Sequence, residues 1–359
     1  MSEKAGTLAR SIAKMALTIG IGAMGGGLFW AIDLPLPWMT GSLSAVAIVA
    51  AAKGPVQAPN RLRNLMIIVL GVMIGSAFTP GIVSQAANWI PSILLLLGFT
   101  VVMIVVLGAG LRRFFGFGPV EAYCSAAPGG FSEMVIIGGE LGGDERAISL
   151  IHSIRITITI LAIPAWYRLF YGFKAVNTGA LGEFSDLTGT DALILTACAI
   201  GGYFVARLIR LPFPVLSGPM FMSAAAHLGG LTSAFPPGVL IALAQVVIGA
   251  TVGCRFKGIT LVDVFGIVKS AIVMAVAMLA GAIGFALLTS EITGLPFQGL
   301  MLAFSPGGVT EMNLIAVALN IDPAMVATHH LSRLGFLILF APFTMKWLVR
   351  AHSDQMRSL

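Results

Sequence analysis

Two matching strings of chemically active residues lie in opposite halves of this chain. Each string combines Pro-Gly-Gly, a hydroxyl residue and a Glu with a more distant His and Arg, and each residue of the second string follows its counterpart by 178 positions. A repeated Glu, His and Arg in an apolar chain predicts one site built from two related halves. The first string contains Pro128, Gly129, Gly130, Ser132, Glu133, His152 and Arg155, and the second contains Pro306, Gly307, Gly308, Thr310, Glu311, His330 and Arg333.

Pro-Gly-Gly predicts a helix break in each string. Proline removes a backbone donor, and two glycines can take conformations that other residues avoid. At membrane depth such a break requires protein, water or a ligand for the freed backbone groups. The half-helices that start near Phe131 and Val309 would direct N–H groups and partial positive charge at the breaks, which predicts an anion or ion site. The alternative is that the glycines only allow close helix packing.

Glu133 and Glu311 follow the second glycine of their strings by three residues. A carboxylate in the first turn is stabilised by the helix dipole, whereas burial favours its protonated form. That balance is typical of a proton or cation carrier. The alternative is a helix cap, in which Ser132 and Thr310 with the following Glu satisfy the helix N-terminus.

His152 with Arg155, and His330 with Arg333, stand three residues apart, so each pair shares one helix face. Arg can hold a carboxylate or phosphate with two parallel hydrogen bonds, and His can relay protons. The alternative is a structural ion pair between each Arg and a Glu of the same or the other string.

Other polar residues suit structural roles. Asp144 and Asp322 precede the last apolar segment of each half and are predicted to cap helices. His329 is expected to be incidental because Ile151 occupies the matching position. No Cys-x-x-Cys pair or His at ligand spacing accompanies the cysteines, so neither a metal nor a cofactor is predicted; the cysteines are Cys124, Cys198 and Cys254.

The composition predicts an integral membrane protein that has the lipid bilayer as its main partner. Of 359 residues, 57% are hydrophobic and only 10% are charged, whereas soluble proteins carry about 25% charged residues. The net charge of +6 comes mainly from short basic clusters between apolar runs. This distribution is typical of topology signals and argues against direct nucleic-acid binding.

The chain is a duplication with opposed halves. Residues 34–41 (LPLPWMTG) match residues 211–218 (LPFPVLSG), and we divide the chain into a first membrane repeat (1–175), a connecting loop (176–190) and a second membrane repeat (191–359). Each half has six apolar segments, but its basic clusters follow alternate segments with opposite phase. Because Lys and Arg mark cytoplasmic loops, this phase predicts inverted repeats.

The expected fold is therefore an all-α polytopic membrane protein of about ten transmembrane helices. Each repeat would contribute about five crossings and one broken or re-entrant Pro-Gly-Gly segment. The short Pro-rich second segment of each half is the alternative for the segment that does not cross. Both termini would be cytoplasmic, and the localisation expected is the bacterial inner membrane. Arg168 and Lys174 depart from this charge pattern.

The paired Pro-Gly-Gly-x-[Ser/Thr]-Glu-Met motifs, the Pro-x-Pro elements and the whole-chain duplication resemble the AbrB family of bacterial membrane proteins. Members of that family carry two labels, ammonia monooxygenase and regulator of gene expression. The residues argue against both as direct activities. The few His residues form no oxygenase ligand set, and no soluble segment is long enough for a DNA-reading module. We therefore expect no enzyme activity.

These features predict a secondary transporter of a small anionic or zwitterionic solute, coupled to protons or a monovalent cation. The breaks would meet near the midplane, with Glu133 and Glu311 as coupling sites and with Arg155, Arg333 and the half-helix N-termini as an anion clamp. A membrane sensor that affects gene expression indirectly is the main alternative; an intramembrane enzyme and a channel fit less well. The solute, the coupling ion and the transport direction stay open, and a homo-oligomer is compatible with the sequence.

Overall fold

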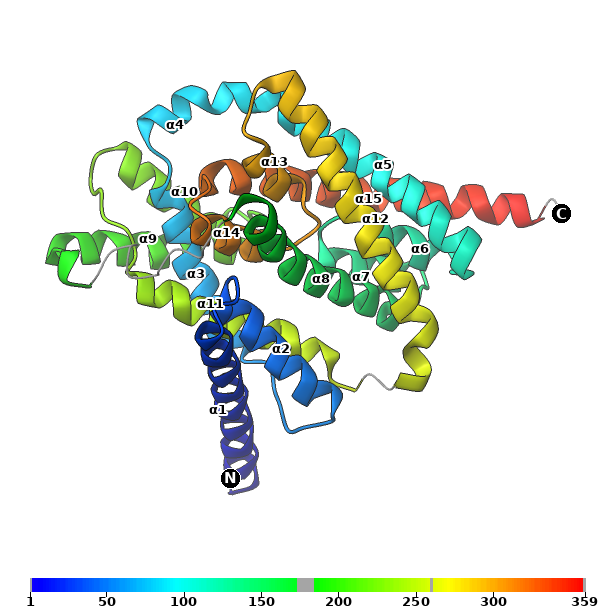
Figure 1. The fold of residues 1–359 in the computed structure, drawn as a ribbon, viewed down its shortest axis with the longest axis horizontal. Coiled ribbons are helices and arrows are strands. Elements are labelled where there is room, and N and C mark those ends of the chain that lie inside the picture. Colours follow the sequence, from blue (N-terminus) through cyan, green and yellow to red (C-terminus); the bar gives the residue numbers. More distant parts are fainter. Residues whose placement is uncertain (1, 173–183, 259–260, 358–359) are drawn as a thin grey trace. The chain divides into compact units, whose positions relative to one another are not determined.

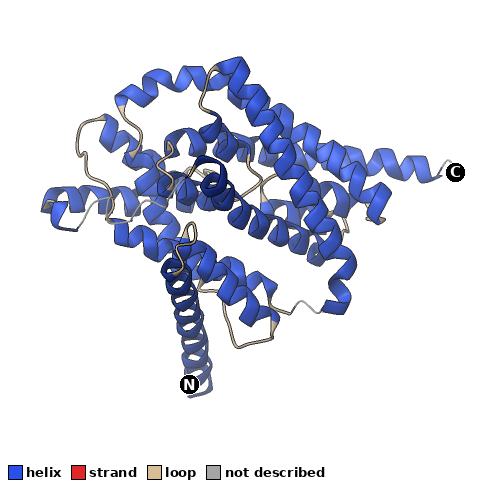
Figure 2. Cartoon of the chain, viewed as in Figure 1, coloured by secondary structure: helices blue, strands red, loops and turns tan. Residues whose placement is uncertain are grey.

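Every regular element in the described part of the chain is a helix. The computed structural model describes residues 2–172, 184–258 and 261–357, and Figure 2 shows helices joined by loops across these ranges. Residues 176–183 of the predicted connecting loop lie outside the described residues; the remainder holds the short helix η3 (Phe184–Asp186) and the start of α9 at Gly189.

Six of the described helices are long and apolar enough to cross a membrane. Each has a window of high mean hydropathy with few charges, which agrees with the predicted membrane class. Two shorter apolar helices, Pro37–Ala51 and Val309–Ala318, add to this set. The six candidate spans are Thr7–Ala31, Ala86–Phe115, Glu145–Tyr171, Gly189–Leu208, Gly238–Phe256 and Gly266–Thr293.

The chain forms two compact units, and each draws on both halves of the sequence. The first unit contains Met1–Gln85, Ile163–Ile259 and Asn313–Ala324, and the second contains Ala86–Ala162, Thr260–Met312 and Met325–Leu359. Each unit therefore combines residues of the first half of the chain with residues of the second half.

The first unit pairs helices of one half with those of the other. α2 packs against both α1 and α11, and α10 packs in the same way against both α9 and α3. The two sets correspond through the duplication, in which α1 matches α9, α2 matches α10 and α3 matches α11. Their bounds are α1 (Ser2–Ala31), α2 (Pro37–Ala51), α3 (Asn60–Ser76), α9 (Gly189–Leu208), α10 (Pro214–Leu228) and α11 (Gly238–Gly253), and the short α4 (Pro80–Gln85) and η4 (Cys254–Phe256) complete the unit.

Glycines allow these helices of the first unit to approach closely. A Cβ on Gly25 would collide with the backbone of Gly41, and a Cβ on Gly202 would collide with that of Gly218. Both contacts join equivalent helices, α1 with α2 and α9 with α10. Small residues at such crossings are typical of helix packing in membranes.

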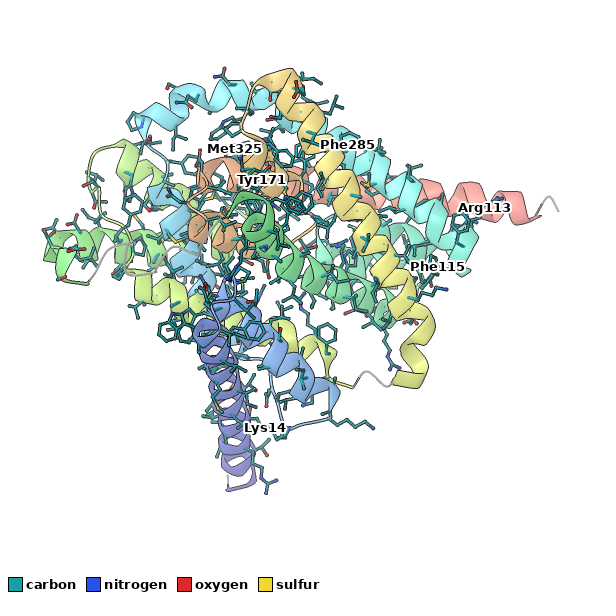
Figure 3. All side chains as sticks on the ribbon, in the orientation of Figure 1. Lys14, Arg113, Phe115, Tyr171, Phe285 and Met325 are labelled. Atoms are coloured by element: carbon teal, nitrogen blue, oxygen red, sulfur yellow. The ribbon has the colours of Figure 1, made fainter. Side chains whose placement is uncertain are left out.

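The second unit holds both Pro-Gly-Gly strings. α5 (Ile90–Phe115) packs against α12 (Leu261–Thr293), and their neighbouring labels can be followed in Figure 1. The Phe99 ring of α5 lies 5.1 Å from that of Phe285, which Figure 3 labels on α12. The remaining helices are η1 (Ala86–Trp89), α6 (Pro119–Ala126), α7 (Phe131–Glu140), α8 (Glu145–Tyr171), α13 (Phe297–Phe304), α14 (Val309–Ala318) and α15 (Pro323–Arg357), of which α8 and α14 continue into the first unit.

Candidate functional site

Both Pro-Gly-Gly strings interrupt a helix at equivalent positions, as predicted. α6 ends at Ala126 and α7 begins at Phe131, while α13 ends at Phe304 and α14 begins at Val309. The second glycine of each string accepts the first helical hydrogen bond of its half-helix: Met134 N–H to the Gly130 carbonyl at 2.8 Å and Met312 N–H to the Gly308 carbonyl at 3.0 Å. Two half-helices of ten residues therefore begin at the breaks.

The two buried histidines bind the half-helices that end at the breaks. Nε2 of His152 lies 3.0 Å from the Cys124 carbonyl oxygen, and Nε2 of His330 lies 3.0 Å from that of Leu302. A carbonyl can only accept, so Nε2 carries the hydrogen in both rings. Each His thus satisfies one of the carbonyls that a helix C-terminus leaves without an intrahelical partner.

The two arginines bind the same helix ends but differ in how many donors they use. Nη1 of Arg155 donates to the Ala127 carbonyl. Nη1 of Arg333 donates to the carbonyls of Ser305 at 3.0 Å and Phe304 at 3.3 Å, and its Nη2 donates to Nδ1 of His330 at 2.8 Å. Only 1% of Arg155 and 2% of Arg333 is exposed.

The two breaks meet at Arg333. Its Nη1 binds the second break, while a Cβ built on Gly129 of the first break would stand only 3.5 Å from its Nε. The same Cβ would lie 3.4 Å from Leu337, one turn further along α15. Nη1 of Arg155 also binds this first break, at the Ala127 carbonyl. Both guanidinium groups therefore belong to one electropositive region of the second unit.

The structural ion pair considered for these arginines is wrong. Within the described ranges, no carboxylate oxygen lies within 4.0 Å of either guanidinium group. Both guanidinium groups instead donate to neutral acceptors: Arg155 to a backbone carbonyl, and Arg333 to two backbone carbonyls and an imidazole nitrogen. Burial of a charge without a counterion is costly, so the region is suited to an anion.

Glu133 and Glu311 occupy the first turns of α7 and α14, as predicted, but their surroundings differ. Only 3% of Glu311 is exposed, and its Oε2 accepts a 2.8 Å hydrogen bond from the Thr310 hydroxyl. Glu133 is half-buried, and its Oε2 is buried without a hydrogen-bond partner in the described structure. Ser132, which corresponds to Thr310, is exposed.

Asp144 and His329 do not belong to the Glu, His and Arg residues at the two breaks. Oδ1 of Asp144 accepts from the backbone N–H groups of Arg146 and Ala147, as expected for a cap of α8; Oδ1 of Asp322 accepts from Ala324 N–H.

His329 was expected to be incidental, yet it is fully buried. Its Nδ1 donates to the Met325 carbonyl (Met325 is labelled in Figure 3), and its Nε2 lies 2.8 Å from the Ser92 hydroxyl. Its distant partner Ser92 gives no local sequence pattern.

Among the described residues, no group of three or more His, Cys, Asp or Glu could hold a metal ion. The arrangement instead offers buried guanidinium donors, the N-termini of two half-helices and a carboxylate in each first turn. Such groups can bind an anion and exchange a proton or a cation. The fold and site therefore define a helical protein of membrane type with paired discontinuous helices.

The family is defined by comparison with known proteins. Residues 38–349 match the family model described as "Transition state regulatory protein AbrB", and this chain belongs to that family. It is 26% identical over 364 residues to "Uncharacterized protein YhjN" of Bacillus subtilis (strain 168), covering 94% of each chain. It is also 25% identical over 315 residues to "Putative regulator AbrB" of Escherichia coli (strain K12), covering 88% of this chain and 90% of that relative.

Proposed function

We propose that this chain is a secondary transporter that moves a small anionic or zwitterionic solute across a membrane. The observation that carries the proposal is the pair of buried guanidinium groups, Arg155 and Arg333, which lie at two helix breaks and have no carboxylate partner among the described residues. A solute anion would provide the missing counter-charge and would also face the N-termini of α7 and α14.

The repeated architecture supports alternating access to such a site. α6, α7 and α8 begin 178 positions before α13, α14 and α15, so each half supplies one broken helix and one helix with the His–Arg pair. The opposite phase of the basic clusters supports inverted repeats and about ten crossings. Movement of one part against the other would then open the site to each side in turn.

The carboxylates at the breaks support coupling to protons or a monovalent cation. Glu133 and Glu311 each lie in the first turn of a half-helix, so their carboxylates stand beside the two breaks. Neither is used in an ion pair with Arg155 or Arg333. Binding and release of a proton or cation could therefore accompany solute movement.

Flux into liposomes tests the proposal. The purified full chain would be reconstituted, and uptake of radiolabelled acetate, succinate, glutamate, glycine, sulfate and phosphate would be compared with that of protein-free liposomes. We expect protein-dependent uptake of at least one of these solutes, and its loss in Arg155→Ala. The matched control is Arg112→Ala, at the end of α5 in a predicted cytoplasmic cluster, which should retain uptake. No protein-dependent uptake of any of these solutes would contradict transport.

A second candidate function is a membrane sensor that binds the solute without moving it. The name "Putative regulator AbrB" of the Escherichia coli relative favours this candidate. The same guanidinium groups and half-helix N-termini would serve a sensor, since they account for binding and not for movement. Saturable binding by the purified protein, with no uptake into liposomes under an imposed proton or sodium gradient, would favour the sensor over the transporter.

A further inference from the structure

The two copies of the site hold their arginines differently. Arg333 makes three hydrogen bonds within its own copy, from Nη1 to two carbonyls and from Nη2 to the His330 ring. Arg155 uses Nη1 alone, and its Nε is buried without a hydrogen-bond partner in the part of the chain that the structure describes. Arg333 is therefore held by three hydrogen bonds of the scaffold, whereas Arg155 is held by one and has a buried Nε–H without a partner in the described structure.

The N–H groups of Arg155 that make no hydrogen bond within the protein determine which kind of ligand group can bind there. When Nη1 is occupied, the Nε–H and one Nη2–H remain, and these two bonds point in parallel from one edge of the planar guanidinium group. Two oxygens of a carboxylate match this edge with two parallel N–H···O bonds.

The glutamates, like the arginines, are held differently in the two copies. The Glu311 carboxylate is held by Thr310 and lies over Gly308, where a Cβ would collide with it. At the equivalent Gly130, the nearest atom to such a Cβ is Oε2 of Glu133, at an ordinary 3.5 Å. Of the Arg and Glu side chains in the two strings, those with a buried polar atom that lacks a hydrogen-bond partner in the described structure are Arg155 (Nε) and Glu133 (Oε2), both of the first copy.

We propose that the solute carries a carboxylate, which Arg155 binds through Nε and Nη2, while Arg333 and His330 position the second break without contacting the solute. This inference deepens the proposed function and rests on the same site. The duplicated sequence would then encode one binding copy and one scaffolding copy. The difference arises from side-chain contacts, because the two strings contain the same Glu, His and Arg.

Equilibrium binding to the purified full chain tests the ligand class. Thermal unfolding would be followed with acetate, succinate, glutamate and glycine, with the primary amides acetamide and succinamide, and with sulfate and phosphate. A ligand that binds the folded state raises its apparent stability. We expect at least one carboxylate to raise the unfolding midpoint, and replacement of its carboxylate by an amide to abolish the shift. Absence of any carboxylate effect, equal binding of an amide, or tighter binding of sulfate or phosphate would overturn the proposal.

The duplication supplies a matched pair of variants for the residue assignment. Lysine keeps the charge but loses the two-pronged donor edge. Arg155→Lys should weaken binding of that carboxylate by about tenfold or more, equivalent to about 1.4 kcal/mol, with little change in the stability of the ligand-free protein. Arg333→Lys should lower ligand-free stability and change the affinity less than about threefold. The reverse pattern would overturn the assignment. If a variant does not fold, the comparison of carboxylate with amide on the unaltered protein still decides the ligand class.

The failures of the two proposals can be separated. Carboxylate binding without flux would contradict transport and leave the assignment to Arg155 intact. Flux of sulfate or phosphate in the absence of carboxylate binding would support transport and overturn the carboxylate assignment.

Discussion

Nη2 of Arg333 donates a 2.8 Å hydrogen bond to Nδ1 of His330, which lies one turn earlier on α15. Because Arg is always a donor, Nδ1 must be the acceptor, and the ring hydrogen sits on Nε2, which donates to the Leu302 carbonyl. His330 is therefore neutral and held in one tautomer. In this conformation it positions Arg333 and does not relay protons.

This arrangement predicts the response of position 330 to substitution. His330→Phe should destabilise the protein by about 1–3 kcal/mol, since both the Leu302 carbonyl and Nη2 of Arg333 lose a partner. His330→Gln should cost less, because an amide offers one acceptor and donors. Thermal unfolding in detergent measures both. The neighbouring His329→Ile, which copies Ile151 of the first half, serves as a control: without the imidazole, the single Ser92 O–H donates to the Trp89 carbonyl, which lies 2.8 Å away. Equal stability of the Phe and Gln variants would contradict the assigned tautomer.

The glycines of the breaks should be sensitive to a single added methyl group. Gly130 has φ of 62°, a left-handed conformation that costs other residues about 1–2 kcal/mol. Gly130→Ala should destabilise by that amount, and Gly308→Ala should displace the Glu311 carboxylate. Gly98→Ala is the control, because nothing lies within 4 Å of a Cβ there, and alanine favours helix. Unfolding of Gly130→Ala at or above the temperature of the unaltered protein would refute this explanation of the break.

Glu133 should carry the coupling more than Glu311 does, since Oε2 of Glu133 has no partner in the described structure. In liposomes with an imposed pH gradient, Glu133→Gln should remove the stimulation of uptake by the gradient, because an amide cannot exchange a proton. Exchange of labelled for unlabelled solute without a gradient should continue. The matched variant Glu311→Gln should retain more of the stimulation. Full stimulation in both variants would exclude coupling through these residues.

Sequence patterns predicted the helix breaks well because proline and glycine act locally: Pro-Gly-Gly interrupts a helix whatever packs around it. The placement of each His and its Arg on one helix face was equally predictable from the helical period. The acceptors of Arg155 and Arg333 were not, because they are backbone carbonyls about 28 residues away, and a carbonyl carries no sequence signature. The assembly of each unit from both halves also depends on distant contacts, such as those of α3 with α10.

The inverted orientation of the repeats can be tested with two equivalent exposed residues. Phe114, beside Phe115 at the end of α5 (Figure 3), is 74% exposed, and Ile292, which follows it by 178 positions at the end of α12, is 60% exposed. In a background with the three native cysteines replaced by Ser, Phe114→Cys should react with a membrane-impermeant thiol reagent only from the cytoplasmic side. Ile292→Cys should react only from the opposite side, because inversion places equivalent helix ends on opposite faces. Intact cells of an expressing bacterium expose the side opposite the cytoplasm to the reagent, and inside-out vesicles expose the cytoplasmic side. Labelling of both positions from one side would mean that the repeats are parallel, and the two breaks would then enter the membrane from the same face.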